Sequence, residues 1–256
     1  TYSASVIMSS FLILLSLVTL LILRVPVAFA LGVLGVFLLW LFPFPLTGVP
    51  QRLFGTMDSF ELLAVPMFLL MSNILLKARI GRDLFAAVQS WVGHWPGGLG
   101  VATILSCGLF SAISGSSVAT AATIGTVAIP EMTERGYSRP FVLGLLAAGG
   151  TLGILIPPSI PLIIYGVVTE TSIPTLFLAG IGPGLFLTSF FIVYSMIYAR
   201  FGGEFTAAPR ASWAERGRTG LLALPTLFLA AAVIGSIYLG IATPSESAGV
   251  GFVLAL

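Results

Sequence analysis

The chain has 256 residues, of which 57% are hydrophobic and 8% are charged, and its mean hydropathy is +1.10. This composition excludes a soluble globular domain and indicates an integral membrane protein of the lipid bilayer. The net charge of +2 gives no indication of nucleic acid as a partner, and the single cysteine, Cys107, excludes an internal disulfide.

Uncharged runs predict the membrane crossings, because a bilayer core about 30 Å thick takes about 20 residues of helix. Three such runs precede the basic cluster that starts at Lys77, and they span residues 4–23, 25–49 and 62–76. Arg24 and Pro26 separate the first two runs, and the third crossing begins near Phe60. The sequence "WVGHWPGG" then breaks the chain. Residues 88–95 are predicted to lie along the inner membrane interface as an amphipathic arm.

Residues 99–130 form an uncharged run of 32 residues, too long for one ordinary span and too short for two full crossings with a turn. This length predicts a re-entrant hairpin of two half-length helices, whose turn falls at Ser114, Gly115, Ser116 and Ser117. A turn at that depth must be buried in protein or line a cavity, because unsatisfied backbone groups in lipid cost several kcal/mol each. Close packing between helices is the alternative interpretation of these small residues.

The basic residues test the hairpin through the positive-inside bias. If the hairpin opens to the cytoplasm, ten of the eleven Lys and Arg residues fall in inner loops, and only Arg52 falls outside. A single crossing over residues 99–130 would instead move Arg135 and Arg139 to the outside. The charge distribution therefore favours the hairpin, and it places the N-terminus outside.

A second long uncharged run, residues 140–169, has the centre "AAGGTLGILIPPSIP". This centre contains three glycines and three prolines, namely Gly149, Gly150, Gly153, Pro157, Pro158 and Pro161. Because glycine weakens a helix and proline removes a backbone donor, the run predicts a crossing made of two half-helices with an unwound middle. Pro157 and Pro158 form either a structural kink or a functional hinge. A crossing over 173–199, an inner loop over 200–218 and a crossing over 221–241 follow.

A hairpin tip that meets a broken helix at mid-membrane is typical of secondary transporters, in which freed carbonyls and half-helix ends bind ions and substrates. The candidate Na⁺ ligands, with the substrate site beside them, are hydroxyl and carbonyl oxygens of Ser114, Gly115, Ser116, Ser117, Gly149, Gly150, Thr151 and Gly153. No Asp, Glu, Lys or Arg falls inside the uncharged runs, so neutral oxygens favour Na⁺ over H⁺ coupling. The positive ends of half-helices suit an anionic substrate.

Two other functional classes use the same residues. An intramembrane serine hydrolase would pair a serine of the turn with His94, but a nucleophile needs its base within hydrogen-bond reach. His94 is predicted at the interface, half a membrane away from the turn. A channel with a re-entrant selectivity loop is the other alternative.

The order and spacing of several motifs resemble those of one transporter family. They are "AVPMFLLM", "VGHWPGGLG", "GLFSAISGSSVATAATIGTVAIPEM", "GYSRPFVLGLLAAGGTLGILIPPSIPLIIYG", "TSIPTLFLAGIGPGLFL" and "GIATPSESAG". They resemble those of the large membrane subunit of tripartite ATP-independent periplasmic (TRAP) transporters, and the resemblance covers residues 60–251.

The resemblance implies an all-α transporter of the bacterial inner membrane, with inverted repeats, a re-entrant hairpin, a broken helix, an elevator mechanism and a periplasmic N-terminus. It implies Na⁺-driven import of an organic acid, such as a sialic acid or a C4-dicarboxylate, and no enzymatic activity. Its partners would be a small TRAP membrane subunit and a periplasmic substrate-binding protein. Another ion-coupled carboxylate transporter, or a channel without a binding protein, remains the alternative.

By the same resemblance, the chain holds the first repeat and the start of the second, so we do not expect it to transport alone. The expected organisation is an N-terminal, mainly scaffold part, an interfacial arm, a transport-domain hairpin, a transport-domain broken helix, a scaffold helix with a cytoplasmic loop, and the start of the second repeat. These parts span residues 1–76, 77–97, 98–130, 131–169, 170–218 and 219–256.

Overall fold

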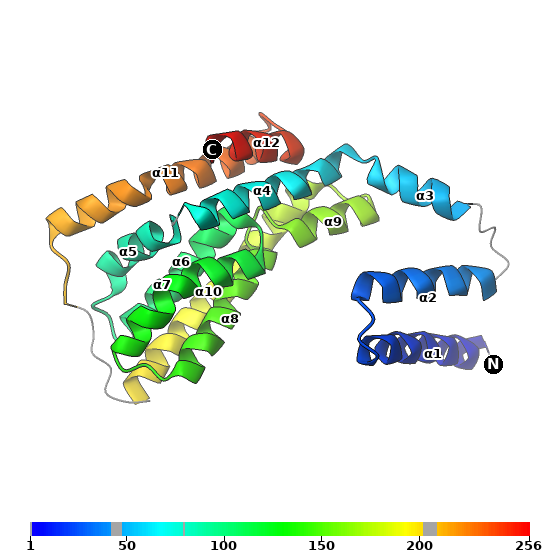
Figure 1. Ribbon diagram of the computed structural model, residues 1–256, viewed down its shortest axis with the longest axis horizontal. Coiled ribbons are helices and arrows are strands. Elements are labelled where there is room, and N and C mark those ends of the chain that lie inside the picture. Colours follow the sequence, from blue (N-terminus) through cyan, green and yellow to red (C-terminus); the bar gives the residue numbers. More distant parts are fainter. Residues whose placement is uncertain (1, 42–47, 79, 202–208) are drawn as a thin grey trace. The chain divides into compact units, whose positions relative to one another are not determined.

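The computed structural model describes residues 2–41, 48–78, 80–201 and 209–256 (Figure 1). Within these residues all regular structure is helical, in agreement with the predicted all-α membrane fold. The chain divides into two compact units, Thr1–Asp58 and Ser59–Leu256.

The first unit contains helices α1 (Tyr2–Ile22), α2 (Val27–Leu41) and α3 (Gly48–Met57). Helices α1 and α2 pack against each other and are separated at Arg24, which adopts a positive φ of 62°. The break predicted at this residue is therefore confirmed. Of the crossing predicted over 25–49, residues 27–41 and 48–49 are helical, and residues 42–47 lie outside the described residues.

The second unit carries the predicted site. Its helices are η1 (Phe60–Leu63), α4 (Ala64–Lys77), α5 (Ile80–Val92), α6 (Gly98–Ser114), α7 (Ser117–Glu134), α8 (Arg139–Leu155), α9 (Ile160–Thr169), α10 (Ile173–Phe201), α11 (Trp213–Tyr238) and α12 (Pro244–Leu254). Four stretches are long and apolar enough to cross a membrane: Phe60–Lys77, Arg139–Thr169, Ile173–Phe201 and Trp213–Tyr238. The break predicted at "WVGHWPGG" is confirmed, since α5 ends and α6 begins within it.

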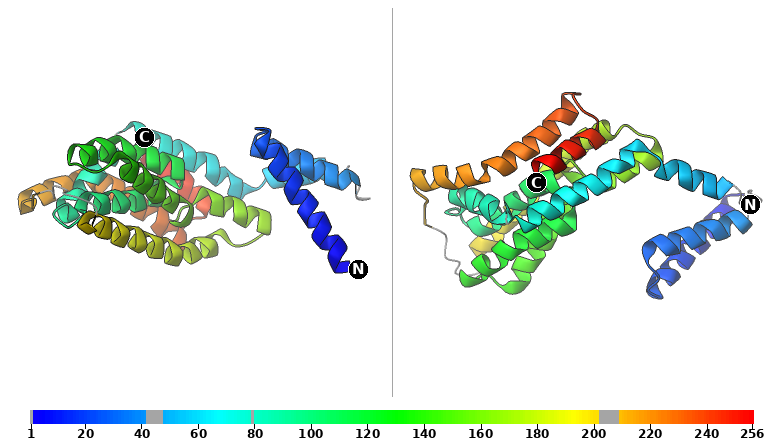
Figure 2. Two further views of the ribbon diagram at one scale, coloured as in Figure 1. Left: turned by 90° about the horizontal axis from the view of Figure 1, so that it is seen from below. Right: turned by 45° about the horizontal axis from the view of Figure 1, so that its top comes forward.

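Helix α6 forms the centre of this unit and is buried along almost its whole length. It packs against α5, α7, α8 and α10, and Figure 2 shows α6, α7 and α8 side by side. Small residues permit this close packing. A Cβ on Gly149 of α8 would lie 2.9 Å from the Cys107 sulfur of α6, and a Cβ on Gly100 would overlap the Ser195 hydroxyl of α10.

The predicted inner loop over 200–218 is too long, because α11 begins at Trp213. The Ser212 hydroxyl accepts a hydrogen bond from the Glu215 backbone N–H at 3.2 Å and so caps the helix. This cap extends the helix N-terminally beyond the uncharged run.

Candidate functional site

The turn between α6 and α7 is formed by Gly115 and Ser116, so a break in the predicted Ser114–Ser117 segment is confirmed. Gly115 ends α6 in the left-handed region, at φ 60° and ψ 12°, which glycine adopts without steric cost. Its N–H donates to the Ser111 carbonyl at 3.0 Å. Ser116 begins α7 as its N-cap, and its hydroxyl accepts from the Ala119 N–H at 3.4 Å.

The hydroxyls on the inner side of this turn pair with one another. The Ser114 hydroxyl lies 3.0 Å and the Ser111 hydroxyl 3.3 Å from the Thr120 hydroxyl, and all three residues are buried. Ser111 and Thr120 were not among the predicted site residues. The sequence did contain a signal for this pairing, because residues at equal distances from a two-residue turn face each other across the two helices. Ser111 precedes Gly115 by four residues, and Thr120 follows Ser116 by four.

Ser117 differs from its neighbours at the turn. Its Oγ is buried and has no hydrogen-bond partner among the residues that the structure describes. Leaving a buried hydroxyl unsatisfied costs about 1–3 kcal/mol, which makes such an atom a candidate ligand where other free oxygens lie beside it. Ser117 therefore offers a hard, neutral oxygen at the tip of the hairpin.

Helix α8 touches the tip through two of its three predicted glycines. A Cβ on Gly153 would lie 2.9 Å from the Ser116 carbonyl carbon and from the Ser117 nitrogen. A Cβ on Gly150 would lie 3.1 Å from the Ser117 carbonyl oxygen. The third, Gly149, faces α6 and permits helix packing there. Because Gly153 lies close to the centre of the Arg139–Thr169 stretch, the tip lies near the middle of that candidate span.

Thr151, also predicted as a ligand, is not brought to the tip. Its side chain is exposed, and its hydroxyl donates to the Ala148 carbonyl of its own helix at 2.6 Å. A helical residue one position after Gly150 lies on a different face from Gly150 and Gly153, which share a face because they are three positions apart.

The predicted unwound middle is confirmed between α8 and α9, where residues 156–159 are not helical. Pro157 and Pro158 lie in this break, and the peptide bond between them is cis. Proline has no N–H, so these two residues leave the carbonyls of Gly153 and Ile154 without their helical donors four residues on. The Ser159 hydroxyl donates to the Ile154 carbonyl at 2.6 Å. The Gly153 carbonyl therefore lacks its helical donor beside the tip.

The break and the tip are joined directly. The Ile160 N–H donates to the Gly115 carbonyl at 3.3 Å, and a Cβ on Gly115 would lie 2.7 Å from the Pro158 carbonyl oxygen. This bond brings the N-termini of α7 and α9 to one place. Ser159 and Ile160 were not among the predicted site residues. The contact of Ile160 joins segments more than forty residues apart, whereas that of Ser159 is local to the break.

His94 lies at the opposite end of α6 from the tip. Helix α6 has 17 residues and is therefore about 25 Å long. The His94 Nδ1 atom is buried without a hydrogen-bond partner among the described residues. Because no serine of the turn can reach His94 across this length, the geometry opposes the hydrolase alternative.

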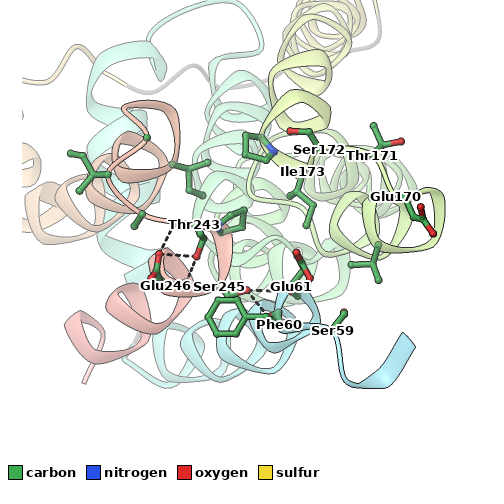
Figure 3. Close-up of a pocket in the computed structure, with 18 residues that line it drawn as sticks. Ser59, Phe60, Glu61, Glu170, Thr171, Ser172, Ile173, Thr243, Ser245 and Glu246 are labelled. Atoms are coloured by element: carbon green, nitrogen blue, oxygen red, sulfur yellow. Dashed lines mark hydrogen bonds between the residues drawn. The ribbon is translucent and has the colours of Figure 1, made fainter. Parts of the chain in front are cut away.

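A separate cavity of about 730 Å³ lies where η1, the α9–α10 connection and the start of α12 meet (Figure 3). Three carboxylate residues line it, Glu61, Glu170 and Glu246, and none of the predicted ion ligands does. The Glu246 carboxylate accepts hydrogen bonds from the Thr243 N–H and hydroxyl, both at 2.8 Å, which hold its pKa below the usual value. In the described part of the chain, no group of three or more His, Cys, Asp or Glu residues is placed to hold a metal ion.

Comparison with known proteins gives a consistent result. The family model described as the tripartite ATP-independent periplasmic transporter, DctM component, matches residues 14–256. An ectoine/5-hydroxyectoine TRAP transporter large permease protein of Ruegeria pomeroyi is 43% identical over 210 residues, which cover 82% of this chain and 49% of the relative. A C4-dicarboxylate TRAP transporter large permease protein of Pseudomonas aeruginosa is 41% identical over 88% of this chain and 52% of the relative.

A sialic acid TRAP transporter large permease protein of Vibrio cholerae is 40% identical over 80% of this chain and 48% of the relative. The chain thus spans about half the length of the curated relatives it matches. This family consists of membrane transporter components, which agrees with the predicted transporter rather than an enzyme. The chain belongs to the family of the DctM component, the large permease protein of TRAP transporters.

Proposed function

We propose that the hairpin tip and the α8–α9 break form a site for Na⁺ and an organic acid in a TRAP large permease. The observation that carries this proposal is the buried Ser117 Oγ, which has no partner among the described residues and lies at the joint of these two segments. A cation of the size and hardness of Na⁺ binds neutral oxygens of this kind where a membrane helix is unwound.

The residues present fit such an ion. Ser117 Oγ and the Gly153 carbonyl, which has no helical donor, would hold it, together with other carbonyls of the turn. A bound Na⁺ would supply the positive charge that attracts a carboxylate. The N-termini of α7 and α9 add partial positive charge beside it, which makes the site suitable for an anionic substrate.

The family supports a proposal for the substrate and the partners. The relatives are named for ectoine, a C4-dicarboxylate and a sialic acid. We infer that the complete protein imports an organic acid through the bacterial inner membrane, together with a small membrane subunit and a periplasmic substrate-binding protein. Transport would be of the elevator type, with the hairpin and α8–α9 moving as one body, as their direct bond at Gly115 and Ile160 favours.

The positive-inside bias supports the proposed orientation. Hydrogen bonds connect the end of α5 to the start of α11, through Arg216 and Ser90, and to the end of α7, through Gln89 and Glu131. The arginines of the α7–α8 connection and of the start of α11 thus gather at one end of the second unit. We assign this end to the cytoplasm, the hairpin as re-entrant from that side, and the N-terminus to the periplasm.

Uptake by the complete permease, reconstituted with its small subunit and binding protein, tests the proposal. Ser117→Ala is expected to raise the Na⁺ concentration for half-maximal uptake about tenfold, because one ion ligand is lost. Ser106→Ala is the matched control, since Ser106 is also a buried hairpin serine without a partner among the described residues, but it does not lie at the turn. Equal effects of the two variants, or uptake that is unchanged without Na⁺, would contradict the proposal. Flux at channel rates without the binding protein would favour the channel alternative.

A further inference from the structure

One arginine side chain lies between two tryptophans where α5 ends and α11 begins. The guanidinium carbon of Arg216 is 5.0 Å from the ring centroid of Trp91 and 5.0 Å from that of Trp213. The two rings meet edge to face, with their centroids 6.1 Å apart. Cation–π attraction at these distances fixes the position of the charge. We call Trp91, Trp213 and Arg216 the Trp–Arg cluster.

Hydrogen bonds hold this cluster in one geometry. The Arg216 Nε donates to the Ser90 carbonyl at 3.2 Å, and the Thr219 hydroxyl donates to the Ser90 hydroxyl at 3.2 Å. The two terminal nitrogens of Arg216 have no hydrogen-bond partner among the described residues, and no described carboxylate forms an ion pair with it. The guanidinium is therefore preorganised, with its outer N–H groups available to an acceptor.

The position of the cluster matches the surface of a bilayer. Trp213 is the first residue of α11, a candidate membrane span, and Arg216 follows within its first turn. Trp213 is 77% exposed and Trp91 is 52% exposed. Tryptophan rings collect at the headgroup level of membranes, where one side of the ring is apolar and the other is wet. Further along α11, the exposed side chains Leu221, Leu224 and Phe228 continue as an apolar surface.

We propose that the Trp–Arg cluster binds the headgroup phosphate of an anionic phospholipid. A phosphodiester offers two oxygens that match the free fork of the guanidinium. The two indole rings would contact the glycerol and upper acyl region, and the acyl chains would lie along the apolar surface of α11. The positive charge of Arg216 favours an anionic group, and the adjoining apolar surface selects a lipid rather than a free anion. This site is separate from the hairpin tip and does not depend on the proposed transport function.

Native mass spectrometry of the complete permease in detergent, titrated with dioleoyl phosphatidylglycerol, tests this site. We expect one saturable lipid adduct. Arg216→Gln is expected to weaken it about tenfold, because a charge-assisted bidentate contact is lost. Arg218→Gln removes the same charge from an exposed position on the same helix, and we expect a change below about twofold. Arg216→Lys keeps the charge without the fork and should give an intermediate loss, which separates lipid binding from misfolding.

Four outcomes would overturn the proposal. Equal weakening by Arg216→Gln and Arg218→Gln would show a diffuse surface charge. Equal affinity for the zwitterionic dioleoyl phosphatidylcholine would show that the anionic headgroup is not recognised. Displacement of the lipid by inorganic phosphate at the lipid's own affinity would show a free-anion site. An adduct that appears only after the small subunit is removed would show that a protein covers the cluster.

Discussion

Replacing Gly153 by alanine tests whether the contact between α8 and the hairpin tip holds the ion site together. The new Cβ would lie 2.9 Å from two backbone atoms of the tip, the Ser116 carbonyl carbon and the Ser117 nitrogen. Comfortable carbon contacts begin at about 3.5 Å, so α8 and the tip must separate by about half an ångström or more. No side-chain rotation can relieve this contact, because both facing atoms belong to the backbone.

The expected loss of Na⁺ affinity in Gly153→Ala follows from two opposing effects on the free energy. Overpacking of this kind costs about 1–3 kcal/mol. Replacing a helical glycine by alanine returns about 0.5–1 kcal/mol. The midpoints of these ranges leave a net cost of about 1.3 kcal/mol, and if it falls on the ion-bound state it corresponds to an about 8-fold loss of Na⁺ affinity.

Gly144→Ala provides the matched control, because Gly144 lies on the same helix and a Cβ there has no atom within 4 Å. This variant should be neutral or slightly stabilising. The assay is the Na⁺ concentration for half-maximal uptake by the complete permease in proteoliposomes, with the thermal unfolding temperature measured with and without Na⁺. If Gly153→Ala shows the same Na⁺ dependence as Gly144→Ala, the reasoning that places the ion at this joint is refuted.

Two further predictions concern the packing and the ends of helices. Gly100→Ala should lower the thermal unfolding temperature, because its Cβ would overlap the Ser195 hydroxyl, and adding Ser195→Ala should recover part of the loss; no recovery would mean that another contact limits this position. The depressed pKa of Glu246 means that its stabilising effect on α12 is present above the ordinary value of about 4.3 and is lost as pH falls through the lower folded pKa. Hydrogen exchange in the first turn of α12, corrected for intrinsic rates, should show this loss. Thr243→Ala should only reduce it, because the backbone N–H of residue 243 still donates to Glu246, whereas Glu246→Gln, which does not titrate, should abolish it; pH dependence that survives in Glu246→Gln would contradict the assigned cause.

Run length and turn chemistry predicted the central architecture. The 32 uncharged residues of the hairpin and the four small residues at its middle located the turn to within one residue at each side, because glycine and serine are the residues that tolerate this backbone. Hydropathy was less informative where a helix begins in polar sequence. The start of α11 depends on the Ser212 cap, which no measure of hydrophobicity detects.

The sequence predicted which segments meet at the candidate site, but it did not predict the hydrogen bonds between them. The hydrogen bond from the Ile160 N–H to the Gly115 carbonyl joins segments 45 residues apart, and a sequence pattern alone does not predict such a contact. Thr151 shows a different limit of prediction from residue type alone. Its residue type is suitable for an ion ligand, but helical periodicity turns it away from the face that Gly150 and Gly153 share.

Glycine and proline make complementary contributions to the proposed site. The glycines of α8 let its backbone approach the tip, and the prolines after it deprive the Gly153 carbonyl of its helical donor at that same place. An ion held by this carbonyl and by Ser117 would bridge α8 and α7, and its binding would stabilise the contact between these two helices. Loss of the ion would then weaken the joint itself. Na⁺ occupancy at the proposed site and the contact between the hairpin and the broken helix would then depend on each other, which is the kind of coupling that the proposed Na⁺-driven transport needs.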